Sequence, residues 1–177
     1  MIADKSEKYF VSCPCNFYQH NNIIVLMVPA FDNNGNLPPG VHNMEWGPFV
    51  ARFGGNSHRK RLIAGLLEGL RSLRRAGCQR VYIDGSFVTD KEMVWHQVPS
   101  DFDLCWDVGG VDPTLLDPTL LDFANKRAAQ KAKYGGEFFP SIYLADTQGN
   151  TFFEFFQIDK NTGLAKGIIS LDLQNLP

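Results

Sequence analysis

The most regular pattern of apolar and polar positions in the chain lies between residues 56 and 78. Apolar side chains recur there at intervals of three and four residues, with arginines between them: Leu62, Ile63, Leu66, Leu67, Leu70 and Leu73. This spacing places them on one face of a helix. Asn56 or Ser57 can cap its start and Gly77 its end. We therefore predict an amphipathic helix that packs on the core.

Shorter apolar runs predict strands, which are separated by turn-rich segments. The predicted strands cover residues 23–29, 80–84, 101–107, 137–145, 151–158 and 166–173, and two further helices are expected over 46–53 and 118–134. Helices and strands alternate early in the chain, and strands cluster late. The predicted class is α+β, with a mixed β-sheet flanked by helices and a β-rich C-terminal part.

Composition fits one globular domain that follows a polar arm. The chain has 177 residues, of which 44% are hydrophobic, and a net charge of −2. This size supports a single core, and the charge argues against a general nucleic-acid coat. We assign residues 1–22 to an N-terminal arm and residues 23–177 to the domain. Because no secretory signal or membrane-spanning run is visible and Cys78 and Cys105 are interpreted as reduced core residues, we expect a cytoplasmic protein without a membrane partner.

Two aspartates interrupt the apolar strand in the sequence PSDFDLCWD. Asp101 and Asp103 are two positions apart, so on a strand they leave the same face with Cα atoms about 6.5–7 Å apart. Two carboxylates that close repel each other unless a cation lies between them. A hard divalent cation, Mg²⁺ or Mn²⁺, fits such oxygen ligands. The alternative is the solvent-exposed face of an edge strand without function.

A Gly-Ser turn precedes the two aspartates and gives the pair a context. The strand that contains Ile83 ends at Gly85-Ser86, where backbone N–H groups and a hydroxyl can approach a phosphate. A strand, a Gly-Ser turn and then Asp-x-Asp on the next strand resemble the nucleotidyltransferase superfamily with the polymerase-β-like core. The connection between the two motifs is slightly longer here than is usual in that family.

The resemblance also implies a third acid on a later strand. Glu137, in the sequence Glu-Phe-Phe after the predicted helix, is the best match by element order, and Glu154 is the competing candidate. A narrower resemblance spans most of residues 28–173 and points to a bacterial family of small, largely uncharacterised nucleotidyltransferase-like proteins. The arm of residues 1–22 lies outside it.

The resemblance implies transfer of a nucleoside monophosphate from a nucleoside triphosphate to an acceptor hydroxyl. Asp101, Asp103 and Glu137 would bind the metal ions, Mg²⁺ or Mn²⁺, and Glu137 would help to deprotonate the acceptor. Gly85 and Ser86 would hold the phosphates. From the sequence itself, Lys166 at the start of a strand is either a phosphate-neutralising group or an exposed turn lysine. The basic residues of the 118–134 helix are interpreted as a solvated face.

Two hypotheses follow. The first is an active nucleotidyltransferase with an unknown acceptor (a small molecule, a protein or RNA), of the kind found in bacterial toxin–antitoxin or defence systems, with a protein partner encoded nearby. The second is a catalytically degenerate fold that binds nucleotide or a partner. The first predicts that Asp101, Asp103 and Glu137 converge next to Ser86. The second is favoured if Glu137 points away or if residues 87–100 fill that space.

Overall fold

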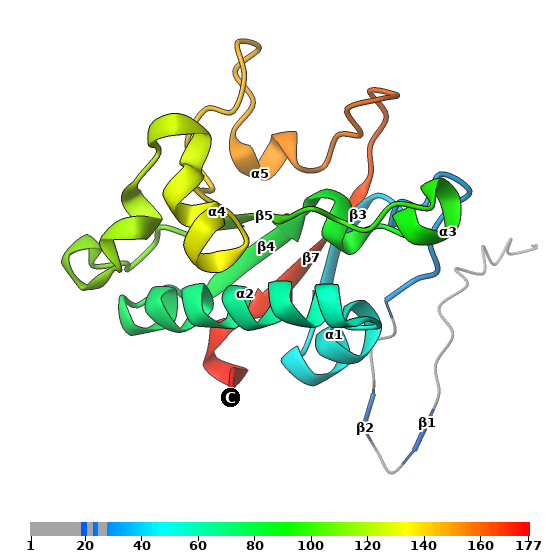
Figure 1. Cartoon of the computed structure of the whole chain (residues 1–177), viewed down its shortest axis with the longest axis horizontal. Coiled ribbons are helices and arrows are strands. Elements are labelled where there is room, and N and C mark those ends of the chain that lie inside the picture. The colour runs from blue at the N-terminus through cyan, green and yellow to red at the C-terminus, as the bar shows by residue number, and fades with distance from the viewer. Residues whose placement is uncertain (1–18, 21–22, 25–27) are drawn as a thin grey trace, which may run out of the picture.

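The fold is α+β, with a five-stranded mixed sheet flanked by helices, as the sequence predicts. The computed structural model describes residues 19–20, 23–24 and 28–177 (Figure 1). The sheet consists of β3 (Gly40–Met44), β4 (Arg80–Asp84), β5 (Phe102–Trp106), β6 (Gly136–Pro140) and β7 (Gly167–Asp172). Two short strands, β1 (Gln19–His20) and β2 (Ile23–Ile24), form a separate antiparallel pair.

The sheet topology brings several strand ends together. The order is β3-β7-β4-β5-β6, in which β3 pairs with β7 and β5 with β6 in parallel, while β4 is antiparallel to both of its neighbours. The C-terminal end of β4 therefore lies beside the N-terminal ends of β5 and β7. The N-terminal end of β6 lies at the same end of the sheet.

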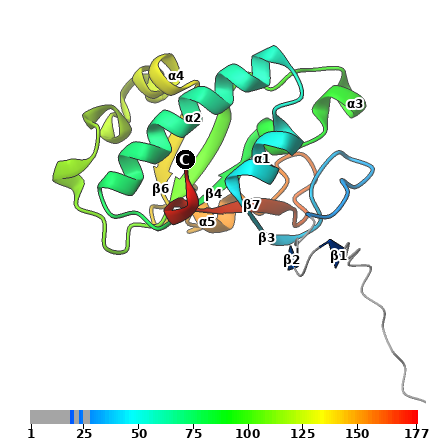
Figure 2. The ribbon, with the colours of Figure 1, turned by 90° about the horizontal axis from the view of Figure 1, so that it is seen from below.

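Five α-helices connect and cover these strands within the described residues. They are α1 (Trp46–Phe53), α2 (Ser57–Arg75), α3 (Lys91–Trp95), α4 (Ala128–Tyr134) and α5 (Phe152–Phe155). Figure 2 shows α2 on one face of the sheet and α5 on the other. Among the described residues, no helix combines the length and the apolar character needed to cross a membrane.

The predicted amphipathic helix is confirmed as α2, together with both of its ends. The Asn56 side chain accepts a hydrogen bond from the backbone N–H of Arg59 at 2.9 Å. At the other end Gly77 has φ +98°, and the N–H groups of Gly77 and Cys78 donate to the carbonyls of Arg74 and Leu73. This pair of bonds is the Schellman motif, which favours glycine at the left-handed position.

Two apolar layers hold the sheet. The larger contains the buried face of α2 together with Ile83, Phe102, Leu104 and Phe138. The smaller lies on the opposite face, where Cys105, Phe139, Phe156 and Ile168 pack together. Side chains alternate between the two layers along each strand. Both faces of the sheet are therefore covered over part of their length. On the face covered by α5, polar side chains lie on the part of the sheet beyond that helix.

The predicted helix over residues 118–134 is wrong in its first half. Short 3₁₀ turns occupy Pro118–Leu121 and Ala124–Arg127, and the α-helix proper is only Ala128–Tyr134. Asn125, Lys126 and Arg127 all have left-handed backbone angles, with φ of 48°, 54° and 57°. A right-handed helix cannot continue through such residues. Gly135, with φ +78°, ends α4 as expected.

The predicted strand over residues 151–158 is also wrong, because its centre is α5. Thr151 and Glu154 form a capping box: the Thr151 hydroxyl accepts from the Glu154 N–H, and the Glu154 carboxylate accepts from the Thr151 N–H. Phe152 and Phe156, one helical turn apart, both contact the Phe139 ring. Local capping and this i, i+4 pair outweigh the strand preference of the aromatic residues.

Other predictions differ in extent. The strands over 80–84, 101–107 and 166–173 and the helix over 46–53 are confirmed within a residue or two. The strand expected over 137–145 stops at Pro140, whereas β3 and α3 were not predicted. Of the strand over 23–29, β2 is present, residues 28–29 have no regular structure, and the rest lies outside the described residues. Most of the arm over 1–22 lies outside them too.

Candidate functional site

Three carboxylates lie side by side on β4, β5 and β6, at one end of the sheet. Asp84 on β4 is the register partner of Asp103 on β5, and Asp103 is the register partner of Glu137 on β6. Register partners send their side chains to the same face. Asp101, two residues before Asp103, joins them at the start of β5. The structure thus brings together the three predicted acids, Asp101, Asp103 and Glu137, and adds Asp84; we call these four residues the acid cluster.

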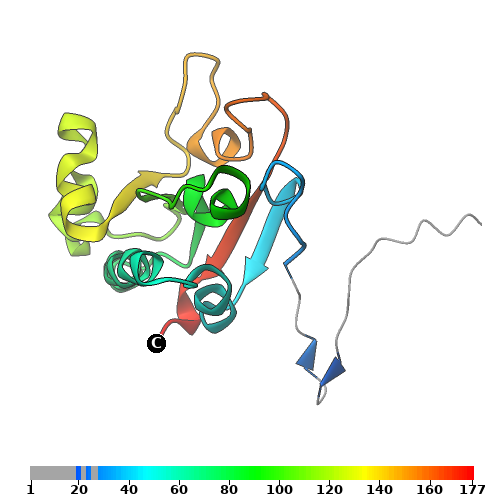
Figure 3. The same cartoon turned by 45° about the vertical axis from the view of Figure 1, so that its right-hand side comes forward.

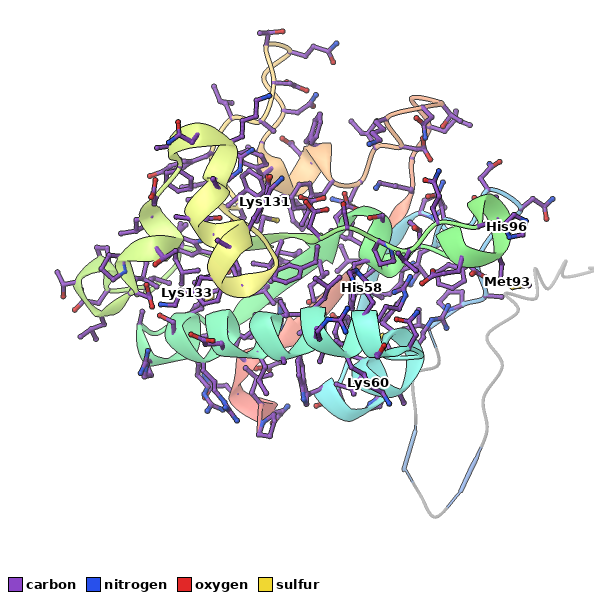
Figure 4. All side chains as sticks on the ribbon, in the orientation of Figure 1. His58, Lys60, Met93, His96, Lys131 and Lys133 are labelled. Atoms are coloured by element: carbon purple, nitrogen blue, oxygen red, sulfur yellow. The ribbon has the colours of Figure 1, made fainter. Side chains whose placement is uncertain are left out.

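Two cations from the α4 region bind the acid cluster. The Lys131 Nζ lies 2.5 Å from Glu137 Oε1 and 3.3 Å from Asp101 Oδ2. The Arg127 Nε donates to Glu137 Oε2 at 2.8 Å. Figure 4 labels Lys131 on α4, close to β5. The interpretation of these basic residues as a solvated face is therefore wrong for Arg127, whereas Lys131 stays exposed but contacts the acids as well. The hydrogen bond with Glu137 is the largest cause that raises the pKa of Lys131.

Asp84 has its own partner. Its Oδ1 accepts from Lys166 Nζ at 2.6 Å, and both side chains are largely buried. Burial raises the pKa of Asp84, while the charge of Lys166 opposes that rise. Lys166 is accordingly not an exposed turn lysine. It joins the loop before β7 to the end of β4, directly beside the Gly-Ser turn.

Asp103 stands out within the acid cluster. Among the described residues no cation forms an ion pair with it, and its carboxylate accepts no hydrogen bond. Burial raises its pKa to about 7, and the neighbouring charges of Asp84, Asp101 and Glu137 add to the shift. The four carboxylates face three cations, Arg127, Lys131 and Lys166. The surplus negative charge therefore falls at Asp103.

The Gly-Ser turn passes directly over this carboxylate. Gly85 has φ +77°, and a Cβ added to it would lie 2.4 Å from Asp103 Oδ2. Glycine is thus required at this position by both its backbone angle and its closeness to Asp103. Ser86 follows at the start of a 3₁₀ turn over Gly85–Val88, and its carbonyl accepts from the Thr89 hydroxyl at 3.0 Å. Gly85 and Ser86 lie next to the acid cluster.

Glu154, the competing third acid, lies elsewhere. It is exposed on α5, where its carboxylate accepts from the N–H and the hydroxyl of Thr151. The hydrogen bond with the Thr151 backbone is the main cause that lowers its pKa. Asp84 is not among the acids predicted from the sequence, although its position immediately before Gly85 at a strand end could have drawn attention to it.

The segment over residues 87–100 is fixed by a buried arginine. Arg59 of α2 forms a two-point contact with Glu92, with Nε and Nη2 at 2.6 and 2.7 Å from the carboxylate oxygens. The same guanidinium donates to the carbonyls of Phe87 and Thr89. Bidentate pairing of this kind is geometrically specific. Arg59 thereby anchors α3 and the end of the Gly-Ser turn to α2, and His96 lies exposed at the end of α3 (Figure 4).

The donor chemistry of the acid cluster suits a hard cation, although its present geometry is not a formed metal site. Among the described residues, no group of three or more His, Cys, Asp or Glu side chains is arranged to hold a metal ion. Both oxygens of Glu137 are bound by Lys131 and Arg127. Carboxylate oxygens with surplus negative charge are nevertheless the ligands that Mg²⁺ prefers. Asp103 fits the ion as it stands, whereas Asp101 and Glu137 fit it once Lys131, and for Glu137 also Arg127, moves aside.

Comparison with known proteins identifies a family. No curated protein and no solved structure matches the chain. One family model, described as "Family of unknown function (DUF6932)", matches residues 29–172. The matched region contains the whole acid cluster and the Gly-Ser turn, and its description names no activity. Since the match extends over most of the sequence, the chain belongs to this family of unknown function, DUF6932.

Proposed function

We propose that the protein is a metal-dependent nucleotidyltransferase, which transfers a nucleoside monophosphate from a nucleoside triphosphate to an acceptor. One observation carries the proposal: Asp103 and Glu137 are register partners on neighbouring strands, and the Gly85 turn lies against the Asp103 carboxylate. Acids and phosphate-approachable backbone thus adjoin at one end of the sheet. The sequence resemblance to the nucleotidyltransferase superfamily rests on these same residues.

Asp101, Asp103 and Glu137 would hold the ions, Mg²⁺ or Mn²⁺. Such ions stabilise the charge that develops on the phosphate oxygens during transfer. The surplus negative charge at Asp103 supports this role, because a cation placed there would relieve the repulsion among Asp84, Asp101 and Asp103. Lys166 would act through Asp84, which it neutralises, rather than by contacting phosphate.

The chain's other residues would bind and orient the substrates. Gly85 and Ser86 would hold the β- and γ-phosphates through their backbone N–H groups and the serine hydroxyl. The acceptor oxygen would form a bond to the α-phosphorus as the bond to the β-phosphate oxygen breaks, so pyrophosphate leaves with that electron pair. Once its carboxylate has separated from Lys131, Glu137 would take the proton of the acceptor hydroxyl. Positioning of the two substrates and stabilisation of the developing charge account for most of the rate acceleration in such a reaction.

A second candidate is a catalytically degenerate fold that binds nucleotide or a partner without turnover. It is favoured by the state of Glu137, both of whose oxygens are held by cations from the α4 region. Internal cations can replace a metal ion as the structural neutraliser of an acid cluster. A protein of this kind would keep Gly85 and Ser86 as a phosphate site.

The setting of the protein belongs to the proposal as well. The free, buried thiols of Cys78 and Cys105 fit a reducing compartment, and we propose the cytoplasm. The acceptor is a small molecule, a protein or an RNA. A role in a bacterial toxin–antitoxin or defence system, with a protein partner encoded nearby, follows from the sequence resemblance alone and stays a prediction.

Calorimetric titration with each nucleoside triphosphate and Mg²⁺ tests the proposal. The wild type is compared with Asp101→Ala/Asp103→Ala and with Glu68→Ala, an exposed acid on α2 that serves as the control. We expect metal-dependent binding that the double variant loses and the control keeps. Absence of binding for every triphosphate, with or without metal, would overturn the proposal.

A second assay separates the two candidates. Pyrophosphate release is followed while the wild type is incubated with the bound triphosphate and candidate acceptors. Release that depends on Asp101 and Asp103 identifies the active enzyme. Triphosphate binding at Gly85–Ser86 without pyrophosphate release, together with a triphosphate affinity that Glu137→Gln does not change, identifies the binding module instead.

A further inference from the structure

A polar cavity of about 410 Å³ opens beside the Gly-Ser turn. Its walls come from the loop before β3, the segment after β4 and the loop before β7. Four amide and two hydroxyl side chains line it: Asn34, Asn36, Gln97, Asn161, Thr89 and Thr162. Figures 1 and 3 show that the loops before β3 and β7 meet near α3, at the end of the sheet where β4 stops.

Thr89 joins the cavity to the turn. Its hydroxyl donates to the carbonyl of Ser86 at 3.0 Å, and its own carbonyl accepts from the buried Arg59. The cavity wall and the Gly-Ser turn are therefore parts of one hydrogen-bonded segment. A ligand whose phosphates lay at Ser86 would have this cavity within reach of its remaining atoms.

The charges of the cavity do not suit phosphates. Asp159 and Lys160 both line it, so the formal charges of its walls cancel. The Asp159 carboxylate is already an acceptor for the Asn36 side chain at 2.6 Å and for the N–H groups of Asn161 and Thr162 at 2.7 and 3.1 Å. Its other polar groups are neutral amides and hydroxyls, carried on apolar stems. These groups fit an uncharged ligand with several hydrogen-bonding atoms.

Several of the side-chain amides that line the cavity have hydrogen-bond donors and acceptors available for a ligand. Within the described residues, the side-chain amides of Asn34, Gln97 and Asn161 form no hydrogen bond with another residue. Each amide offers a donor and an acceptor side by side, the pattern that matches the edge of a nucleobase. The volume lies within the usual range for small-molecule sites, about 300–1,000 Å³.

From these observations we infer that the cavity binds the nucleoside part of the substrate, with Asn34 and Gln97 reading the edge of the base. This inference rests on the proposed function, because it takes the phosphates to lie at Gly85–Ser86. It goes beyond that function in assigning base selection to loops that carry none of the acid cluster.

The test compares nucleotides with inorganic tripolyphosphate, which has the phosphates but no nucleoside. The full chain is titrated with ATP, GTP, CTP, UTP and tripolyphosphate, each with Mg²⁺. The variants are Asn34→Ala and Gln97→Ala, both at exposed positions, and the control is Gln148→Ala, an exposed amide at the tip of another loop. We expect the first two variants to weaken binding of the preferred triphosphate about tenfold and to reduce its preference over the others. Their affinity for tripolyphosphate, and every affinity of the control, stays unchanged.

Two different failures can be told apart. If the triphosphates bind no more tightly than tripolyphosphate, or if Asn34→Ala and Gln97→Ala change neither affinity nor preference, the inference is overturned and the proposed function stands. If neither the triphosphates nor tripolyphosphate binds, both are overturned together.

Discussion

Asp84 and Asp103 lie directly opposite each other in the antiparallel pairing of β4 and β5, and both carboxylates leave the same face of the sheet. Of the two, only Asp84 has a cation among the described residues, Lys166, at hydrogen-bonding distance. The pairing therefore places an unneutralised carboxylate beside another acid in a largely buried position. Asp103 carries the consequence, since burial and neighbouring charge raise its pKa to about 7.

The free energy of unfolding should depend on the ionisation of Asp103. Its pKa is raised from 3.8 in the unfolded chain to about 7 in the folded protein, so the folded state binds the proton more tightly. The stabilisation that protonation provides is fully present below pH 4 and is lost as the pH rises through 7. Asp103→Asn removes this dependence. In EDTA at pH 8 it should be more stable than the wild type, by up to about 4 kcal/mol.

Urea unfolding between pH 4 and 8 measures the difference. Near pH 4 the two proteins should be almost equally stable, and the difference in stability should grow as the pH rises from about 4 to 7. Asp107→Asn, at an exposed position just after the opposite end of β5, is the control and should follow the wild type throughout. A gap that stays constant with pH would show that Asp103 does not titrate in this range.

Removal of the Lys131 charge should make metal binding stronger. Lys131 contacts both Glu137 and Asp101, the groups that an incoming cation needs. Its side chain is partly exposed, so Lys131→Met should cost about 1 kcal/mol or less of stability without metal. The affinity for Mg²⁺ should rise about fivefold, because the ion no longer competes with the ammonium group.

Lys133→Met provides a matched control for that measurement. Lys133 lies two residues away on α4 and pairs with Asp117, outside the acid cluster. Its replacement should leave Mg²⁺ affinity unchanged in the same titration. Weaker Mg²⁺ binding in Lys131→Met would contradict the competition and would make Lys131 a helper of the metal site.

Alanine at Gly85 should disturb the site more than alanine at another left-handed glycine. Gly110 has almost the same backbone angle, φ +74°, but a Cβ there meets nothing within 4 Å. Gly110→Ala should therefore cost about 1–2 kcal/mol for the backbone alone. At Gly85 the new methyl group would meet the Asp103 carboxylate as well.

We expect Gly85→Ala to lose more stability than Gly110→Ala and to lose nucleotide binding, which Gly110→Ala keeps. Thermal unfolding and titration with triphosphate and Mg²⁺ measure both effects. Equal stability and equal nucleotide affinity of the two variants would mean that the close approach of Gly85 to Asp103 is not needed for nucleotide binding.

Substitution of the two candidate third acids, Glu137 and Glu154, should have clearly different effects on Mg²⁺ affinity. Glu137→Gln removes a buried charge from the acid cluster and leaves Arg127 and Lys131 without that partner, so Mg²⁺ affinity should fall at least tenfold. Glu154→Gln only weakens the capping box of α5, at a cost of about 1 kcal/mol or less. Calorimetry with Mg²⁺ and thermal unfolding of both variants give the comparison. A loss of metal binding in Glu154→Gln alone would reverse the assignment.

The patterns of the sequence predict the fold better in its regular parts than at its breaks. The α2 helix carries its own caps, Asn56 and Gly77, and its apolar spacing is unambiguous, so its limits could be predicted. The three consecutive residues with left-handed backbone angles that end at Arg127 include no glycine, so the sequence does not predict this break in the helix. The sequence of α5 predicts a strand because aromatic residues favour strands, whereas its geometry depends on one capping box and on contact with Phe139.

The acids of the site could be predicted, and their partners could not. Asp101 and Asp103 share a face because strand geometry requires it, and Glu137 is the third acid that the nucleotidyltransferase resemblance implies from the order of the elements. The ion pairs of Lys131 and Lys166 join positions whose meeting depends on how the chain packs in three dimensions. No periodicity in the sequence records such a meeting. Asp84 was missed for the same reason, since its role comes from its neighbour across the sheet.

The division of labour between strands and loops has a consequence for how such proteins diversify. Asp84, Asp103 and Glu137 are fixed by strand register, whereas Asn34 and Asn161 stand on loops outside the sheet. Insertions or exchanges in those loops would alter what is recognised and leave the carboxylates where they are. Within one lineage, a new ligand could thus be acquired without rebuilding the chemistry.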